Sequence, residues 1–145
     1  MQSKLILLLA FLMLFGCDSG SDNNANNVRR NTINTSIVDT WEYIYPASQC
    51  VETNTFNDDN TFIVNSLDEV QTGTYTFDPP TVEGGRFRLV LNYLSDNGLS
   101  SCSGDISDST GLQLTFWAEF PNSNQVNWFQ TSSGGSSVGT FTRAQ

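Results

Sequence analysis

Short runs of strand-forming residues, separated by clusters of turn-forming residues, are the feature that most constrains the fold of this chain. The runs are rich in Thr, Val, Tyr, Phe and Trp, and the clusters consist of Asn, Asp, Gly, Ser and Pro, which is typical of strands joined by turns. No window repeats apolar residues at the spacing of an amphipathic helix. We therefore predict eight strands, at residues 38–45, 50–56, 61–65, 72–77, 86–94, 112–120, 126–131 and 138–143. A weaker ninth candidate covers residues 102–106.

Apolar and polar side chains alternate within these runs, which assigns the faces of the strands. One face of the run 86–94 carries Phe87, Leu89, Leu91 and Tyr93. One face of the run 112–120 carries Leu112, Leu114, Phe116, Ala118 and Phe120. Eight short antiparallel strands, each buried on one face only, predict an all-β fold, either a small barrel or a two-sheet sandwich.

Four short motifs carry a resemblance to a known family. They are Asp39-Thr-Trp41, Phe56-Asn-Asp-Asp-Asn-Thr-Phe62, Gly73-Thr-Tyr75 and Gly139-Thr-Phe141. Together they resemble the small bacterial lipocalin-like lipoproteins over most of residues 36–145. The resemblance implies a small antiparallel up-and-down β-barrel of about eight strands, with Trp41 at its closed end.

The chain departs from that family in three ways. Asp39 stands where glycine is usual, the domain is shorter than a full lipocalin, and no C-terminal helix follows the last strand. With short strands and no capping helix, we expect the inward faces to be largely filled. The expected remainder is a shallow cleft near Trp117 and Tyr93.

The N-terminal residues have the pattern of an export signal. An unbroken apolar run from Leu5 to Phe15 spans about 16 Å as a helix, roughly half of the hydrocarbon core of a bilayer, so a signal peptide is favoured over a membrane span. Leu14-Phe15-Gly16-Cys17 resembles the lipobox of bacterial lipoproteins. The resemblance implies lipid on the Cys17 sulfur, cleavage before Cys17 and acylation of the new amine. The alternatives are an ordinary signal peptide cut nearby and an uncleaved anchor.

The predicted organisation has three parts. Residues 1–16 are the lipoprotein signal peptide, residues 17–35 contain the lipidated cysteine and a disordered tether with almost nothing to bury, and residues 36–145 form the barrel domain. We expect the protein in the cell envelope, anchored to the inner or outer membrane, with its domain in the periplasm or at the cell surface.

The cysteine count agrees with this organisation. Three cysteines are an odd number for an exported protein. Assigning Cys17 to lipid leaves Cys50 and Cys102, which can pair in an oxidising compartment. The alternative is two buried free thiols.

The composition limits the catalytic and metal-binding chemistry that is open to this chain. The chain has no histidine, and its only lysine is Lys4 in the signal peptide, so His-based triads, histidine-ligated zinc and Schiff-base chemistry are excluded. Glu42, Glu52 and Glu119 remain as an acid–base set, but no spacing pairs them, and the Asp-rich turns lack the spacing of a calcium loop. We predict no enzyme activity, no cofactor and no metal.

The mature chain carries five arginines against fifteen acidic residues, which disfavours nucleic acid as a partner.

Two functions remain. The first is binding of a small apolar or amphipathic ligand, and the candidate residues for it are Trp117, Tyr93, Phe87, Leu91 and Phe116. The three tryptophans have packing as their alternative role, and Arg86 with Arg88 could grip a carboxylate or pair with neighbouring acids. The second function is a protein-interaction module, for example an inhibitor of a cationic enzyme. A cavity favours the first function and a filled core the second.

Overall fold

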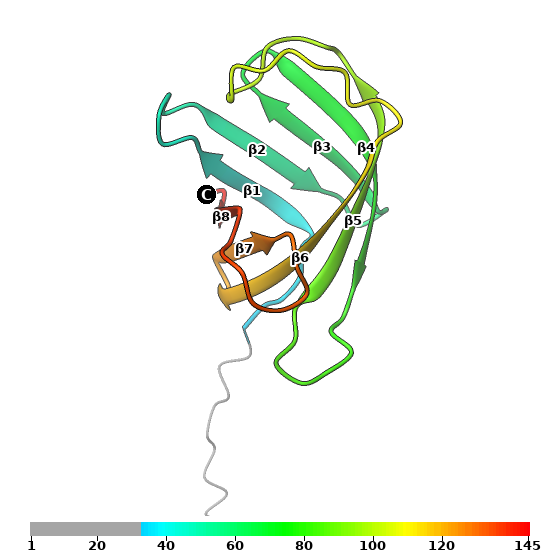
Figure 1. The fold of residues 1–145 in the computed structure, drawn as a ribbon, viewed down its shortest axis with the longest axis vertical. Helices are drawn as coiled ribbons and strands as arrows, with labels where there is room; N and C mark the ends of the chain where they lie inside the picture. The colour runs from blue at the N-terminus through cyan, green and yellow to red at the C-terminus, as the bar shows by residue number, and fades with distance from the viewer. Residues whose placement is uncertain (1–32) are drawn as a thin grey trace, which may run out of the picture. The chain divides into compact units, whose positions relative to one another are not determined.

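The computed structural model describes residues 33–145 and contains eight strands in that range. They are β1 (Asp39–Ile44), β2 (Val51–Phe56), β3 (Thr61–Ser66), β4 (Glu69–Asp78), β5 (Phe87–Asp96), β6 (Gln113–Asn122), β7 (Gln125–Phe129) and β8 (Gly139–Arg143) (Figure 1). All eight predicted strands are confirmed. The weaker ninth candidate is wrong, because residues 102–106 form a turn-rich segment with one isolated bridge between Ser100 and Ile106.

The predicted signal peptide, the lipid site Cys17 and most of the tether lie outside the described residues. Over residues 33–145, no helix is long and apolar enough to cross a membrane.

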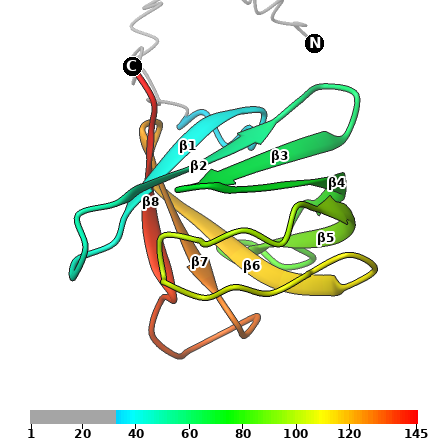
Figure 2. The ribbon, with the colours of Figure 1, turned by 90° about the horizontal axis from the view of Figure 1, so that it is seen from above.

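The eight strands form one closed antiparallel barrel, in which each strand pairs with its neighbours in sequence and β1 closes the ring against β8. Figure 2 shows the ring of strands from above. The closure is short: Trp41 pairs with Arg143, and Glu42 pairs with Thr142. The predicted all-β, up-and-down barrel is therefore confirmed.

One end of the barrel is filled by side chains. Alternation points Trp41, Phe56 and Phe62 inward, and each is at most 2% exposed. The Trp41 Nε1–H donates to the carbonyl oxygen of Ile37 at 2.7 Å, which satisfies the one polar atom of a fully buried ring. Trp41 thus lies where the family resemblance expected it, and this end is closed.

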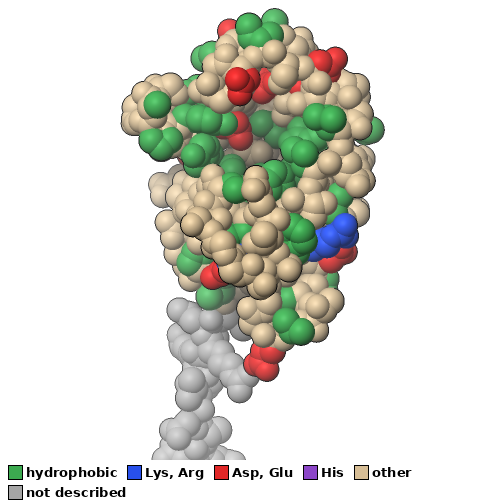
Figure 3. All heavy atoms as spheres, in the orientation of Figure 1, with side chains coloured by type: hydrophobic (Ala, Val, Ile, Leu, Met, Phe, Trp, Pro, Cys, Tyr) green, Lys and Arg blue, Asp and Glu red, His purple; other side chains and the backbone are tan. Residues whose placement is uncertain are grey.

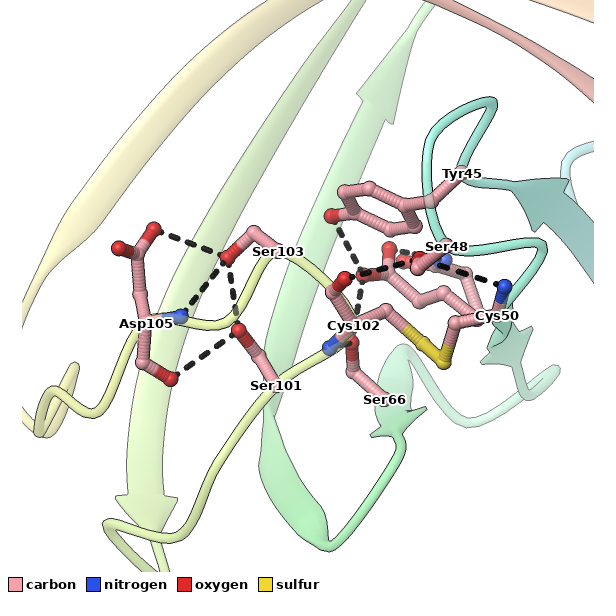
Figure 4. The surroundings of a disulfide bond; sticks show 10 residues. Tyr45, Ser48, Cys50, Ser66, Ser101, Cys102, Ser103 and Asp105 are labelled. Atoms are coloured by element: carbon pink, nitrogen blue, oxygen red, sulfur yellow. Dashed lines mark hydrogen bonds between the residues drawn. A yellow bond between two sulfur atoms is a disulfide. The ribbon is translucent and has the colours of Figure 1, made fainter.

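The opposite end carries the β1–β2 and β5–β6 connections, seen at the top of Figure 1. A disulfide joins Cys50 of the first connection to Cys102 of the second, with Cα atoms 5.4 Å apart. The Cys102 amide also donates to Ser66 Oγ at 3.0 Å, and Ser48 Oγ donates to the Cys102 carbonyl at 3.3 Å (Figure 4). The predicted Cys50–Cys102 pairing is confirmed, and it ties the long β5–β6 loop down onto the barrel.

The predicted apolar face of β6 is buried only in part. Ala118 and Phe120 are buried, but Leu112 and Leu114 are 50% and 40% exposed. The cause is the length of β7, whose pairing with β6 begins at Trp117, so the start of β6 has a partner on the β5 side only. The wall of the barrel is therefore incomplete beside Leu114.

Candidate ligand-binding site at the open end of the barrel

A cavity of about 230 Å³ lies inside the barrel at the end opposite Trp41. Residues from all eight strands and from two connections line it: Tyr43, Tyr45, Glu52, Asn54, Val64, Gln71, Tyr93, Phe116, Trp128, Val138, Gly139 and Phe141. In the space-filling view, hydrophobic and acidic side chains surround a hollow in the upper half of the molecule (Figure 3). The predicted filling of the inward faces thus holds for the closed end but not for this one.

Stacked aromatic rings form one wall of the cavity. Trp128 lies on Phe141 with ring centroids 4.2 Å apart, and the ring centroid of Phe116 is 5.3 Å from that of Trp128. Tyr43 packs against Phe141 at 5.2 Å. Because neighbouring rings hold each other in place, this apolar surface is formed without a ligand. Within residues 33–145 the buried Trp128 Nε1–H has no hydrogen-bond partner.

Polar residues line the cavity on β2 and β4, which lie across the ring of strands from β6 and β8, and Glu52 is one of them. The carboxylate of Glu52 accepts hydrogen bonds from Tyr45 Oη at 3.1 Å, Ser66 Oγ at 3.0 Å and Asn54 Nδ2 at 3.0 Å. These three donors are neutral. A carboxylate has about four acceptor positions, so Glu52 retains capacity for one more donor.

Further carboxylates lie close to Glu52. Glu69 is 6% exposed, and its pKa is raised, first by burial and then by the negative charges of Asp96 and Glu52. Burial, followed by the charges of Glu52, Glu69 and Asp96, raises the pKa of Tyr93 to about 12. The pKa of Tyr45 is raised for the same two reasons, burial and the charge of Glu52. The open end of the barrel is therefore a region of negative potential.

The five predicted ligand-binding residues do not form one site. Tyr93 and Phe116 line the cavity. Leu91 is part of the closed core, and Phe87 stacks on Phe77 with centroids 4.9 Å apart, near Phe120.

Trp117 lies on the outside of the barrel. It pairs with Arg88 and borders an outer hollow formed by Asp78, Pro79 and Pro80. The prediction of one cleft near both Trp117 and Tyr93 is therefore wrong for Trp117. Successive residues of a strand point to opposite faces, so Trp117 cannot share the interior with Phe116.

The arginines take the second of their two predicted roles. Arg86 pairs with Glu119 at 3.4 Å, and Arg88 pairs with Asp78 at 3.5 Å. Of the three glutamates considered as an acid–base set, Glu52 lines the cavity and Glu119 faces Arg86 outside it. They are not opposed across one site.

Sequence reasoning missed most of the cavity wall. Tyr43, Tyr45, Glu52, Trp128 and Phe141 were not among the predicted ligand residues. One signal was available, since alternation along β2 places Glu52 on the same face as buried Asn54 and Phe56. Polar residues on the inward face of a barrel strand indicate an interior that is not simply core.

Comparisons with known proteins give no relative for this site. No protein-family model, no curated protein and no solved structure matches the chain.

Proposed function

We propose that the barrel binds a small amphipathic molecule in the cavity at its open end. The apolar part of the ligand packs against the rings of Trp128, Phe141 and Phe116, and its polar part faces Glu52 and Asn54. The observation that carries the proposal is the composition of the cavity wall, which is largely aromatic with a few convergent polar groups, as in binding sites for small molecules.

The size of the cavity limits the ligand. Its volume of about 230 Å³ is below the roughly 300–1,000 Å³ of sites for drug-sized ligands. The closed end is filled by Trp41, Phe56 and Phe62, so a long acyl chain has no room to extend along the barrel axis. The expected ligand is therefore compact, with one or two rings or a short branched chain.

We further propose that the protein is a lipocalin-like lipoprotein of the cell envelope, held to a membrane by lipid on Cys17. The lipobox-like residues before Cys17 and the brevity of the apolar run support this proposal. The disulfide between Cys50 and Cys102 suits an oxidising compartment. The protein would then bind its ligand in the periplasm or outside the cell.

Calorimetric titration of the purified full chain with 1-naphthalenemethanol, a compact neutral amphipath, tests ligand binding. We expect saturable binding to the unmodified chain. The variant Val64→Phe adds bulk to a residue in the cavity wall and should weaken binding roughly tenfold, about 1.4 kcal/mol. Ile63→Phe is the matched control, because it adds the same ring on the outer face of β3, where Ile63 is 37% exposed.

Near-ultraviolet circular dichroism of both variants verifies that they are folded. Equal weakening by the two variants would place the bound probe outside the cavity and contradict the proposal. No binding to the unmodified chain would also contradict it, and would favour the alternative function, a protein-interaction module whose acidic surface meets a cationic partner.

A further inference from the structure

We propose that the open-end cavity selects ligands that carry a positively charged nitrogen, such as a primary or quaternary ammonium group. This inference rests on the proposed function and adds the charge of the ligand. It follows from the neutral hydrogen-bond donors around Glu52, from the pairing of the arginines of residues 33–145 with other carboxylates, from the carboxylates near the cavity, and from its aromatic rings.

Within residues 33–145, no cationic side chain forms an ion pair with Glu52. Its three hydrogen-bond donors, from Tyr45, Ser66 and Asn54, are neutral groups. They orient the carboxylate and leave its negative charge in place. Among residues 33–145, Glu52 is the one carboxylate in the cavity wall, so a ligand donor placed there meets an oriented charge.

The cations of residues 33–145 are Arg86, Arg88 and Arg143. Each of them is paired elsewhere: Arg86 with Glu119, Arg88 with Asp78, and Arg143 with Asp39. Arg86 and Arg143 also lie over the rings of Phe129 and Trp41. None of the three borders the cavity.

The negative charge around the cavity comes from several side chains together. The charged and titratable groups that act on Glu69 or Tyr93 are Glu52 on β2, Glu69 at the start of β4, Asp96 at the end of β5, and Asp105 in the β5–β6 loop. An anionic ligand would be repelled by all of them, whereas a neutral ligand would leave their mutual repulsion unrelieved. A cation relieves it.

The aromatic rings across the cavity from Glu52 suit a cation. Trp, Tyr and Phe faces attract ammonium groups, most strongly when water is excluded. The cavity combines Trp128, Phe116 and three tyrosines with one carboxylate. An organic cation is the ligand class for which rings and carboxylate act together.

The test compares three probes with one ring system and different heads: 1-naphthylmethylammonium, 1-naphthalenemethanol and 1-naphthoate. The purified full chain is titrated calorimetrically with each probe at neutral pH. We expect the cation to bind at least about tenfold more tightly than the alcohol, the ratio that about one well-placed charge contact gives, and the anion to bind more weakly than either.

In the variant Glu52→Gln the affinity for the cation should fall to about that for the alcohol, both measured on the same variant, so that the preference for the cation is lost. Glu42→Gln is the matched control. It removes an equal charge from the neighbouring strand β1, where Glu42 pairs with Thr53 in register and does not border the cavity. It should preserve the preference of the unmodified chain.

The outcomes separate this inference from the proposed function. Equal binding of cation and alcohol to the unmodified chain, or tighter binding of the anion, would overturn the charge selectivity and leave a ligand-binding cavity in place. Absence of binding by all three probes would overturn the proposed function and this inference with it. Because the comparison of heads uses the unmodified chain, it decides the question even where a Glu52 variant does not fold.

Discussion

At the scale of single residues, the two interior glutamates differ in how their charges are accommodated. Glu52 is held by three neutral hydrogen-bond donors, whereas Glu69 is buried beside like charges that raise its pKa after burial itself. A carboxyl whose pKa is raised on folding destabilises the fold where it is ionised. Glu69 therefore contributes charge to the open end at a cost in stability.

Replacing Glu69 by Gln should stabilise the protein at neutral pH. Because the folded pKa lies above the unfolded one, the wild-type penalty is absent in acid and grows as pH rises through the folded pKa. The thermal midpoint of Glu69→Gln should exceed that of the wild type at pH 7, and the difference should vanish near pH 3. An unchanged or lower midpoint at pH 7 would contradict the assignment. The same variant should reduce the preference for a cationic ligand.

Tyr93 gives a second dependence on pH, at the alkaline end. Its folded pKa of about 12 lies above its ordinary value of 10.0. Its contribution to stability is thus complete below pH 10 and is lost as pH rises through 12, by up to about 3 kcal/mol. Tyr93→Phe should therefore lose less stability than the wild type between pH 9 and pH 12, as measured by urea unfolding at fixed pH. Parallel pH profiles of the two proteins would refute this role.

At the scale of elements, β4 depends on one glycine. The register of β4 against β5 shifts between Thr72 and Gly73. A Cβ on Gly73 would collide with the carbonyl oxygen of Asn92 and approach the ring of Phe62 to 2.5 Å. Backbone and a buried ring cannot both move away, so the glycine of the Gly-Thr-Tyr motif is required by close packing.

Gly73→Ala should lower the free energy of unfolding by about 3 kcal/mol or more. Thr74→Ala, the matched control at the next position, should change it by less than about 1 kcal/mol, because Thr74 is only partly buried. Denaturant unfolding of the full chain measures both. If Gly73→Ala changes the free energy of unfolding only slightly, the backbones of β4 and β5 move apart easily at this point and close packing does not require the glycine.

The β5–β6 loop is the second element with a definable role. Its Cys102 amide donates to Ser66 Oγ, and Ser66 Oγ in turn donates to Glu52. The disulfide that holds Cys102 therefore also helps to position the cavity carboxylate.

Replacing both Cys50 and Cys102 by Ala should destabilise the protein by roughly 4 kcal/mol on the chain-entropy model, given the sequence separation of 52. It should also weaken binding of the cationic probe more than binding of the neutral one. Thermal unfolding and calorimetric titration check the two effects. A double variant as stable as the wild type, or free thiols in the wild-type protein, would contradict the effect on stability. An unchanged preference for the cationic probe would contradict the effect on binding.

At the scale of the whole molecule, the proposed anchor is a property of residues that precede the barrel. Cys17→Ser should release the protein from the membrane fraction and block cleavage of the signal peptide, because the run from Leu5 to Phe15 is too short to span a bilayer. Fractionation of cells that express each form is the measurement. A Cys17→Ser protein that still sediments with membranes and is cut normally would rule out lipidation at this residue.

The sequence alone determined the existence of the eight strands, the direction in which most of their side chains point, and the partner of Cys50. These features depend on local alternation, on turn-forming clusters and on a count of cysteines, all of which are readable without knowing which strands meet. The inward positions of Leu89, Leu91 and Tyr93 are examples, and all three are buried.

Only the tertiary structure decided where the interior is full and where it is hollow. Leu114 and Ala118 share a face of β6, but the first is exposed and the second buried, because β7 covers only the later part of β6. Strand length and register around a closed ring set this coverage, and neither can be read from one strand. The same geometry brought Glu52, Tyr93 and Trp128, which are distant in sequence, to one cavity and left Trp117 outside it.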